Sequence, residues 1–506
     1  MPWRIGCQDA IPMKMNNAKQ TVNITRYARL ADGFYDEMMS PSGAPRWPAL
    51  SVARMLFGKN EKELSALQKE TDAIIQALGI TFTVYRDNKT TLDRAWPLDV
   101  APRVIDGVSW DKIEAGLFQR LHTLNCFLHD VYHDEKILKA KVVPESLVKK
   151  SPHYRPQCRG VKPIFSVWAH ICGSDLVRDK DGRMMVLEDN LRVPSGVSYM
   201  LENREVLHRA LARRFLDVAR CVRSVHRYPQ QLCQMLASLS PRPEEDPTIV
   251  LLTPGVFNSA YFEHLFLARE MGVALVEPAD MVVLDEMVYL RTIGGLRRVD
   301  VIYRRIDDWF LDPDEMYLES TLGIAGLMAA WRAGNVAIAN APGCGVVDDK
   351  AVYAYVPQMI KYYLGEEPLL DNVPTFWLGD KQRMEEVLAR MKHYVIKPAN
   401  KSGGYGVVIG PKTTAAKRNV VAAKIRARPG NFVAQPLVEL SVTPTVIGGK
   451  LEPRHVDLRP FTLQSNRYDC TAGGLTRVAR QRGSYIVNSS QGGGSKDTWV
   501  VDRQKK

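Results

Sequence analysis

Three residues with oxygen-bearing side chains, Asp175, Glu188 and Asn190, flank a turn that the sequence Asp-Lys-Asp-Gly predicts at 179–182. Because side chains alternate along a strand, residues 188 and 190 share one face, and residue 175 can lie opposite them on the partner strand. Two carboxylates and an amide oxygen suit Mg²⁺, which keeps its other positions for water and phosphate oxygens. The alternative is a surface hairpin with solvated acidic side chains.

A predicted strand that ends at Lys397 is followed by a glycine-rich loop. The strand end would bring an ammonium group to a phosphate, and glycines let backbone N–H groups approach phosphate oxygens closely. The loop residues in question are Ser402, Gly403, Gly404 and Gly406. A plain turn between two strands is the alternative interpretation of such a loop.

Arginines occur at two further places that suit anion binding. Arg304 and Arg305 follow a predicted strand, where a guanidinium can bind a carboxylate or acyl phosphate in bidentate fashion. Adjacent strand residues point opposite ways, so at most one of the two faces the site, and an ion pair between domains is the alternative. Arg459 alternates with Asp457 on one face of another predicted strand and is the preferred additional phosphate clamp.

These motifs together resemble those of the ATP-grasp enzymes, including the D-alanine:D-alanine ligases. The upstream Asp, the Glu-x-Asn and the following Pro-x-Gly resemble their magnesium segment, and Val-Ile-Lys-Pro with its glycine loop resembles their ATP-binding lysine. The resemblance implies that Lys350 is a second phosphate-binding lysine. It also implies an adenine-binding linker at Gln435 and Leu437, with Glu439 at the ribose. The family's usual arginine two residues before the Asp is here Gly173, and Arg192 is a candidate replacement.

The order of these motifs is reversed relative to the usual ATP-grasp chain, because the metal ligands precede the lysines. From about Trp96 to Trp499 the chain resembles circularly permuted ATP-grasp proteins related to the synthetase half of glutathionylspermidine synthetase, without the amidase half. The resemblance implies a ligase that uses ATP and Mg²⁺ to join a small-molecule or peptide acid to an amine through an acyl phosphate. A non-catalytic Mg·ATP-binding scaffold or sensor, and a kinase that stops at a phosphorylated product, stay open.

The expected fold class is α/β (α+β), a circularly permuted ATP-grasp fold with an inserted small parallel α/β domain and an N-terminal helical region. The expected units are 1–95, mainly helical; 96–240, with the metal ligands; 241–340, the small α/β domain; and 341–506, the nucleotide-binding lobe and C-terminal segment. Helices are predicted over 61–78, 110–134, 204–223 and 259–271. Strands are predicted over 163–171, 184–188, 248–253, 273–276, 282–284 and 299–303.

Composition narrows the class of protein. The chain has 506 residues, of which 45% are hydrophobic and 25% charged, as in globular proteins of two to four domains. The net charge of +12 comes from dispersed basic residues, which argues against nucleic acid as a partner. No apolar run long enough for a membrane span or a secretory signal is present, which predicts a cytoplasmic protein with eight reduced cysteines.

Overall fold

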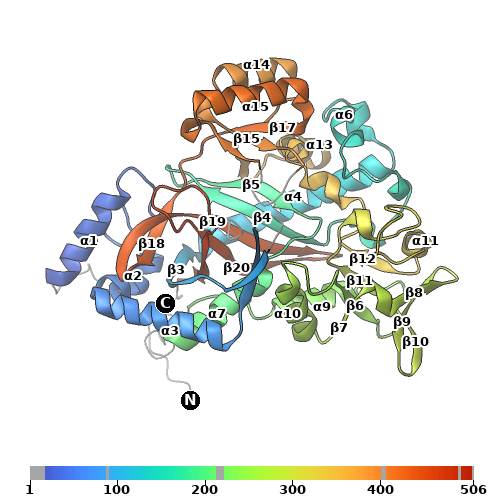
Figure 1. Ribbon diagram of the computed structural model, residues 1–506, viewed down its shortest axis with the longest axis horizontal. Helices are drawn as coiled ribbons and strands as arrows, with labels where there is room; N and C mark the ends of the chain where they lie inside the picture. Colours follow the sequence, from blue (N-terminus) through green and yellow to red (C-terminus); the bar gives the residue numbers. More distant parts are fainter. Residues whose placement is uncertain (1–17, 87–89, 212–220, 401–405, 488–491, 504–506) are drawn as a thin grey trace.

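The computed structural model describes residues 18–86, 90–211, 221–400, 406–487 and 492–503. Its centre is an eight-stranded sheet that combines strands from the N-terminal and C-terminal parts of the chain (Figure 1). In order across the sheet these are β13 (Asp371–Asn372), β5 (Met184–Asn190), β4 (Ile171–Arg178), β19 (Lys450–Gln464), β20 (Tyr468–Val478), β21 (Gly494–Val501) and β3 (Leu98–Asp106), with β18 (Val442–Ile447) paired to β19. The hairpin predicted around the turn at 179–182 is present, since β4 and β5 pair antiparallel, but its first strand spans 171–178 instead of the predicted 163–171.

Helices cover both faces of this sheet. In β21, Val500 packs into the cluster formed with α4 (Gly107–Tyr132), whereas Trp499 and Val501 pack into the cluster that contains α3 (Glu61–Ala77) and α7 (Val197–Leu211). This is the alternation expected of a strand buried on both faces. The helices predicted over 61–78 and 110–134 are confirmed. The first begins with a capping box in which Asn60 accepts from the Glu63 N–H and Glu63 accepts from the Asn60 N–H.

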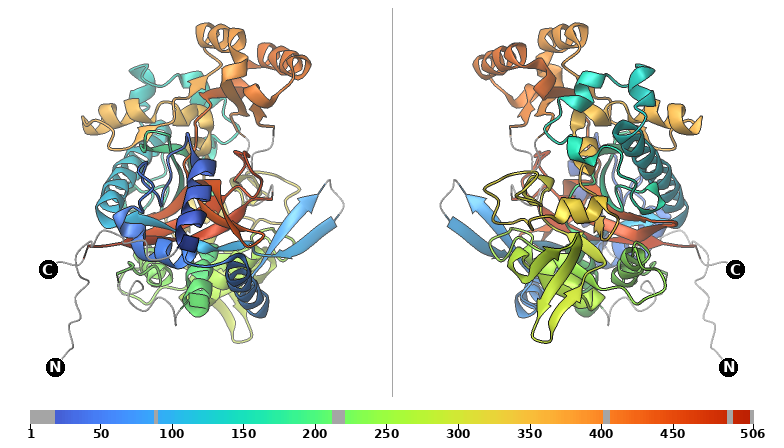
Figure 2. Two further views of the ribbon diagram at one scale, coloured as in Figure 1. Left: turned by 90° about the vertical axis from the view of Figure 1, so that its left-hand side faces the viewer. Right: turned by 90° about the vertical axis from the view of Figure 1, so that its right-hand side faces the viewer.

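Further helices surround these layers. Near the N-terminus lie α1 (Ala18–Ala31) and α2 (Leu50–Phe57); beyond α4 lie α5 (Lys136–Lys139), α6 (Glu145–Lys149), α12 (Lys350–Tyr353) and α13 (Val356–Leu364). The strands β1 (Thr81–Arg86) and β2 (Thr90–Ala95) form a hairpin of their own that projects from the body of the molecule (Figure 2). Of the helix predicted over 204–223, residues 204–211 belong to α7, and 212–220 lie outside the described residues.

A small parallel sheet lies beside the central one, as expected. Its order is β12 (Ala337–Ala339), β11 (Val301–Arg304), β6 (Ile249–Leu252) and β7 (Ala274–Val276), and its helices are α9 (Tyr228–Ala237), α10 (Tyr261–Met271) and α11 (Leu327–Arg332). The strand expected at 282–284 exists, but its assignment to this sheet is wrong. It forms β8 (Met281–Leu284) in an antiparallel sheet with β9 (Met287–Thr292) and β10 (Gly295–Arg298), because Asp285 and Glu286 adopt positive φ and turn the chain back at once.

A separate lobe stands above the central sheet in Figure 1. It contains the antiparallel sheet β14 (Phe376–Trp377), β17 (Phe432–Pro436), β15 (Tyr394–Pro398) and β16 (Val408–Ile409), with the helices α14 (Lys381–Ala389) and α15 (Ala415–Ala427). We refer to residues 376–436 as the upper lobe. The unit expected at 341–506 therefore contributes to two different sheets, since β18 to β21 belong to the central one.

The strand predicted over 163–171 is wrong except for its last residue. Residues Ile164–Ser166 form a short 3-10 turn in which Phe165 and Ser166 have φ near +58°, and β4 begins only at Ile171. The apolar run suggested a buried strand, but Pro163 cannot donate to a ladder, and the Phe165 side chain is 47% exposed. Local hydrophobicity is a weak guide here, because a short apolar run has no periodicity of its own.

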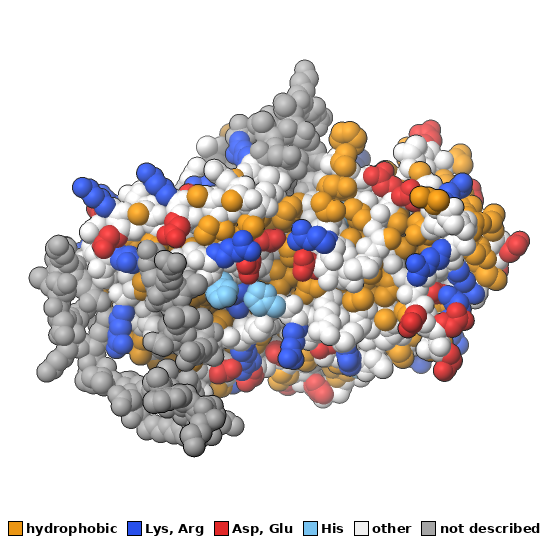
Figure 3. Space-filling model, turned by 90° about the horizontal axis from the view of Figure 1, so that it is seen from below, with side chains coloured by type: hydrophobic (Ala, Val, Ile, Leu, Met, Phe, Trp, Pro, Cys, Tyr) orange, Lys and Arg blue, Asp and Glu red, His pale blue; other side chains and the backbone are white. Residues whose placement is uncertain are grey.

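The charged side chains are dispersed over the surface, as the sequence predicts for the basic residues. On the face seen in Figure 3, basic and acidic side chains are interspersed rather than gathered into separate patches. Within the described ranges no helix combines the length and the apolar character needed to cross a membrane. The seven cysteines in those ranges are free thiols.

Buried ion pairs connect distant segments of the chain. Glu37 is 5% exposed and accepts from Arg103 of β3 (2.6 Å), Arg178 of β4 (3.2 Å) and the Ser441 hydroxyl (2.7 Å). Burial by itself raises the pKa of Glu37, but the two guanidinium groups and the hydroxyl outweigh it and bring the pKa to about 2. The Glu37 carboxylate is therefore one of the contacts that attach the N-terminal region to the central sheet, together with backbone hydrogen bonds to Val442.

We expect Glu37→Gln to lower the free energy of unfolding at pH 7 by about 3 kcal/mol, because it leaves two buried guanidinium groups without their anion. The depressed pKa means that Glu37 stabilises the fold above its ordinary pKa of about 4.5 and loses this contribution as the pH falls toward 2. The difference between variant and parent, measured by urea unfolding, should thus narrow below about pH 4.5. The exposed Glu385→Gln is the control, and an equal loss of stability in it would contradict this account.

Candidate nucleotide and metal site

A cavity of about 720 Å³ is lined by residues from the upper lobe, the central sheet and the small parallel α/β unit. The β4–β5 hairpin contributes Asp175, Glu188 and Asn190 to its wall, and the upper lobe contributes Lys397 and Gln435. Side chains from the N-terminal half of the chain and side chains from its C-terminal part therefore line one cavity.

The three predicted metal ligands lie together because of strand register. Asp175 is directly opposite Glu188, and Gly173 is directly opposite Asn190, in the antiparallel pair β4–β5. Residues directly opposite each other in such a pair point to the same face. All three side chains line the cavity.

Asp175 is 1% exposed and is held by two arginines from the neighbouring strands. Arg459 of β19 donates Nε to Oδ1 (2.5 Å) and Nη2 to Oδ2 (2.9 Å), and Arg477 of β20 donates Nη2 to Oδ2 (2.7 Å). Burial opposes ionisation of Asp175, but the two guanidinium groups hold its pKa well below the usual range. A carboxylate has about four acceptor positions, and the three donated hydrogen bonds leave one on Oδ1 for a cation.

The other two donors are also available to a cation. Asn190 donates Nδ2 to the Gly173 carbonyl (3.1 Å), which leaves its Oδ1 without a partner among the described residues. Glu188 is partly exposed and pairs with Lys350 (3.1 Å). No group of three or more His, Cys, Asp or Glu side chains that could hold a metal occurs in the described part of the chain. Two carboxylates and one amide oxygen form an incomplete set, which fits Mg²⁺ that keeps water and phosphate oxygens.

Both predicted lysines lie on the cavity wall. Lys350 is the first residue of α12, and its N–H donates to the Ala399 carbonyl (3.0 Å), which fixes the helix start beside the end of β15. The pKa of Lys397 falls to about 8, because burial and the nearby Lys350 lower it by more than Glu188 and Asp175 raise it. This mutual influence places the Lys397 ammonium within electrostatic reach of the carboxylates of the hairpin.

Part of the cavity wall is apolar. It is lined by Leu187, Val373, Val395, Ile409, Leu437, Val438 and Leu440. Gln435 lies here too, with its Nε2 donating to the Thr375 hydroxyl (2.8 Å). Glu439 is exposed and lies outside this wall, as does Gly406, whose φ is +79°. Ser402, Gly403 and Gly404 lie outside the described residues.

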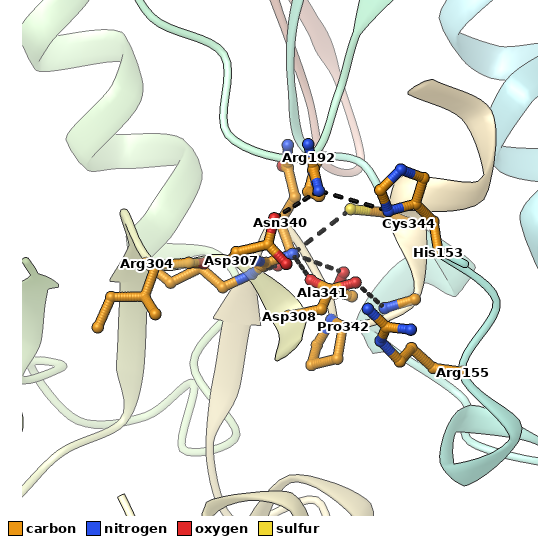
Figure 4. A network of polar contacts seen from close by, with 12 residues as sticks. His153, Arg155, Arg192, Arg304, Asp307, Asp308, Asn340, Ala341, Pro342 and Cys344 are labelled. Carbon is orange, nitrogen blue, oxygen red and sulfur yellow. Dashed lines mark hydrogen bonds and ion pairs between the residues drawn. The ribbon is translucent and has the colours of Figure 1, made fainter. Parts of the chain in front are cut away.

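The predicted arginines do not all line the cavity. Arg192 lines the cavity but is paired with Asp307 and with Asp348 (3.4 Å), as Figure 4 shows for the first of these. Arg304 is 1% exposed and lies away from the cavity in an ion pair with Asp308 (2.5 Å). Its guanidinium also donates to the Asn340 and Ile306 carbonyls (2.6 and 2.7 Å), so it supports the fold rather than the cavity.

Arg305 takes an intermediate position. It lines the cavity, yet it is 3% exposed and pairs with Glu263 of α10 (2.9 Å) while donating to the Pro194 carbonyl (2.6 Å). Only Arg305 of the two lines the cavity, in agreement with the expectation that at most one of them faces the site. Both arginines form ion pairs, but with partners inside the expected unit at 241–340 rather than between domains.

Arg459 occupies the space over Gly173. A Cβ at residue 173 would lie 3.3 Å from Cδ and 3.5 Å from Cγ of Arg459. The alkyl part of Arg459 thus lies beside Gly173 while its guanidinium pairs with Asp175, and Arg192 is paired with Asp307 and Asp348. Arg477 was not among the predicted site residues, although it lies opposite Asp457 in the β19–β20 ladder and donates to it (2.9 Å). Only the pairing of these two strands could identify it.

Comparison with known proteins identifies a matching family and relatives of this chain. The family model described as circularly permuted ATP-grasp type 2 matches residues 102–479. An uncharacterized protein of Synechocystis is 48% identical over 472 residues, covering 92% of this chain and 97% of that protein. A protein of Frankia casuarinae that is provisionally named a glutamate–cysteine ligase is 41% identical over 477 residues, covering 93% of this chain and 54% of that protein.

A solved structure has the same fold. The glutathione synthetase-like effector from Globodera pallida superposes with a TM-score of 0.58 over 88% of this chain and 98% of its own, at 10% sequence identity. The order of the motifs, the shared cavity and the family match over most of the chain all indicate the same family. The chain belongs to the circularly permuted ATP-grasp type 2 family.

Proposed function

We propose that this protein is an ATP-dependent ligase that activates a carboxylate as an acyl phosphate and joins it to an amine. The observation that carries the proposal is the single cavity in which three oxygen donors, two lysines and Arg459 surround the space between an apolar base pocket and the small parallel α/β unit. The name given to the Frankia relatives points in the same direction, although this chain corresponds to about half of their length.

The residues fit the steps of such a reaction. Lys350 and Lys397 hold the phosphates of ATP, and the Gln435–Leu437 segment lies against the base. A magnesium ion bound by Asp175, Glu188 and Asn190 would neutralise charge on the γ-phosphoryl group during its transfer. Arg459 donates to Asp175 from the same face and directs positive charge toward the transferred group. The substrate carboxylate attacks the γ-phosphorus, ADP leaves, and the amine then displaces phosphate from the acyl carbon.

Lys397→Ala should weaken ATP binding about 100-fold, because it removes a charge-assisted contact from a partly buried position in the cavity wall. Isothermal titration with Mg·ATP measures this, and thermal unfolding checks that the variant is folded. Lys424→Ala on α15 is the control, since that side chain is exposed on the same lobe. Unchanged affinity in Lys397→Ala would remove the lysine from the site.

Glu188→Gln should raise the Mg²⁺ concentration needed for tight ATP binding by roughly tenfold or more, since an amide is a poorer ligand for Mg²⁺ than a carboxylate. The measurement is ATP affinity across a magnesium series in the variant, the parent and Glu385→Gln. A magnesium dependence in Glu188→Gln equal to that of the parent would exclude this residue as a ligand.

The type of reaction is distinguished by its products. The full chain, incubated with ATP and a metabolite extract, should release ADP and inorganic phosphate in equal amounts, and mass spectrometry should detect a condensed product. A kinase that stops at a phosphorylated product would release ADP without phosphate. A scaffold or sensor would bind Mg·ATP and release neither, and either outcome would reject the ligase.

A further inference from the structure

Of the three oxygen donors on the β4–β5 hairpin, Asn190 is held most weakly by its own side chain. Two guanidinium groups fix Asp175, and Glu188 pairs with Lys350 (3.1 Å). Among the described residues, the side chain of Asn190 makes one hydrogen bond, from its Nδ2 to the Gly173 carbonyl (3.1 Å). An amide oxygen has no net charge to draw it to a cation, so it contributes as a ligand when it is already in place. The position of Asn190 therefore depends on the backbone at this end of the hairpin.

The side chain of Asn340 joins the two strands of the hairpin just beyond Asn190, which is the last residue of β5. Its Oδ1 accepts from the His170 N–H (2.7 Å) and the Ile171 N–H (2.8 Å). Its Nδ2 donates to the Ile171 carbonyl (2.7 Å) and to the Leu191 carbonyl. Two N–H groups on one side and two carbonyls on the other assign the orientation of this amide. Asn340 thus holds the residue that directly follows Asn190.

Asn340 follows β12 and is itself held by the ion pair of Arg304 with Asp308 (Figure 4). Arg304 donates its Nε to the Asn340 carbonyl (2.6 Å) and its Nη2 to the Ala341 carbonyl (3.3 Å). Asp308 accepts from the Gly343 N–H (2.9 Å). All of these residues are buried, so the chain that leaves β12 is fixed against the small parallel α/β unit.

The same segment reaches the end of β5 a second time. Asp348 accepts from the Leu191 N–H (2.6 Å) and the Arg192 N–H (3.1 Å). The N–H and the carbonyl of Leu191 are therefore both bound to the chain between β12 and α12. Through this segment, the small parallel α/β unit determines where β5 ends.

We propose that Asn340 is a positioning residue for the metal ligand Asn190. This inference rests on the proposed function, because it takes Asn190 as a ligand of the magnesium ion. Asn340 lies outside the wall of the cavity and acts through the Leu191 carbonyl. The pair of Arg304 with Asp308 keeps Asn340 in place, so both residues affect the site without touching a ligand.

Titration of the full chain with ATP, with and without Mg²⁺, tests the proposal without turnover. The quantity compared is the gain in ATP affinity that saturating Mg²⁺ brings. Asn340→Ala should reduce this gain by about fivefold, because it releases the backbone that holds a metal ligand. The affinity for metal-free ATP should stay that of the parent, since Lys350 and Lys397 are unchanged. A purely structural loss would lower the affinity in both titrations equally.

Asn125 provides a matched control. Its buried side chain also makes four hydrogen bonds, three of them to the chain that leads into β4. It accepts from the Trp168 and Ala169 N–H groups and donates to the Ala169 carbonyl and the Gln464 side chain, and none of these bonds reaches β5 or Leu191. Asn125→Ala should therefore lower the melting temperature, as Asn340→Ala does, and keep the magnesium gain of the parent.

A parent-like gain in Asn340→Ala, an equal reduction in Asn125→Ala, or an equal fall in affinity with and without Mg²⁺ would overturn the proposal. If Asn340→Ala does not fold, Arg304→Lys decides the question. The lysine keeps a cation beside Asp308 but lacks the planar group that reaches two carbonyls, so the gain should fall about twofold, and a parent-like gain would reject the proposal.

Glu188→Gln separates this inference from the proposed function. If the gain is parent-like in Glu188→Gln as well as in Asn340→Ala, the metal site itself is rejected together with the role of Asn340. If Glu188→Gln loses the gain and Asn340→Ala keeps it, the metal site stands and only the positioning role is wrong.

Discussion

The site depends on one buried carboxylate and the strand register that surrounds it. Asp175 lies on β4 between Glu188 of β5 and two arginines from β19 and β20. If any of these strands shifted by one residue in register, the side chain that it contributes would point to the opposite face of the sheet, away from the cavity. Because an unpaired charge in such a place is costly, the two guanidinium groups and the carboxylate fix one another.

This constraint explains how a permuted chain forms a single cavity. The residues around Asp175 come from positions near 175, 188, 459 and 477, and the lysine that faces them comes from the upper lobe at 397. Chain order is irrelevant to the sheet, because hydrogen bonds between strands require only adjacency and register. The same geometry can therefore be reached with the metal ligands before the lysines.

Many charged residues of this protein serve the fold. Two buried ion pairs join distant segments, Glu37 with Arg103 and Asp99 with Lys496, and a third joins the near neighbours Arg304 and Asp308. Residue type alone does not separate these from residues that face a ligand, since an arginine suits both a buried carboxylate and a phosphate. Burial and partners make the distinction, and they place Arg304 with the fold and Arg459 with the cavity.

The sequence by itself determined the features that depend on short-range pattern. Alternation along the β4–β5 hairpin predicted that Asp175, Glu188 and Asn190 share a face, and periodicity predicted α3 and α4. The reversed order of the motifs indicated the permuted family, which the comparison shows. These inferences hold because strand and helix periods are local properties of the chain.

Only the tertiary structure decided which long-range partners meet. The contact of Arg459 with Gly173 and the ion pair of Arg477 with Asp175 both depend on strands that are far apart in sequence. The apolar run at 163–170 contains a 3-10 turn at Ile164–Ser166 rather than a strand, and the short run has no periodicity from which this could be predicted. Sequence spacing carries no information on which of several arginines will be buried against which carboxylate, because that choice is made by strand pairing.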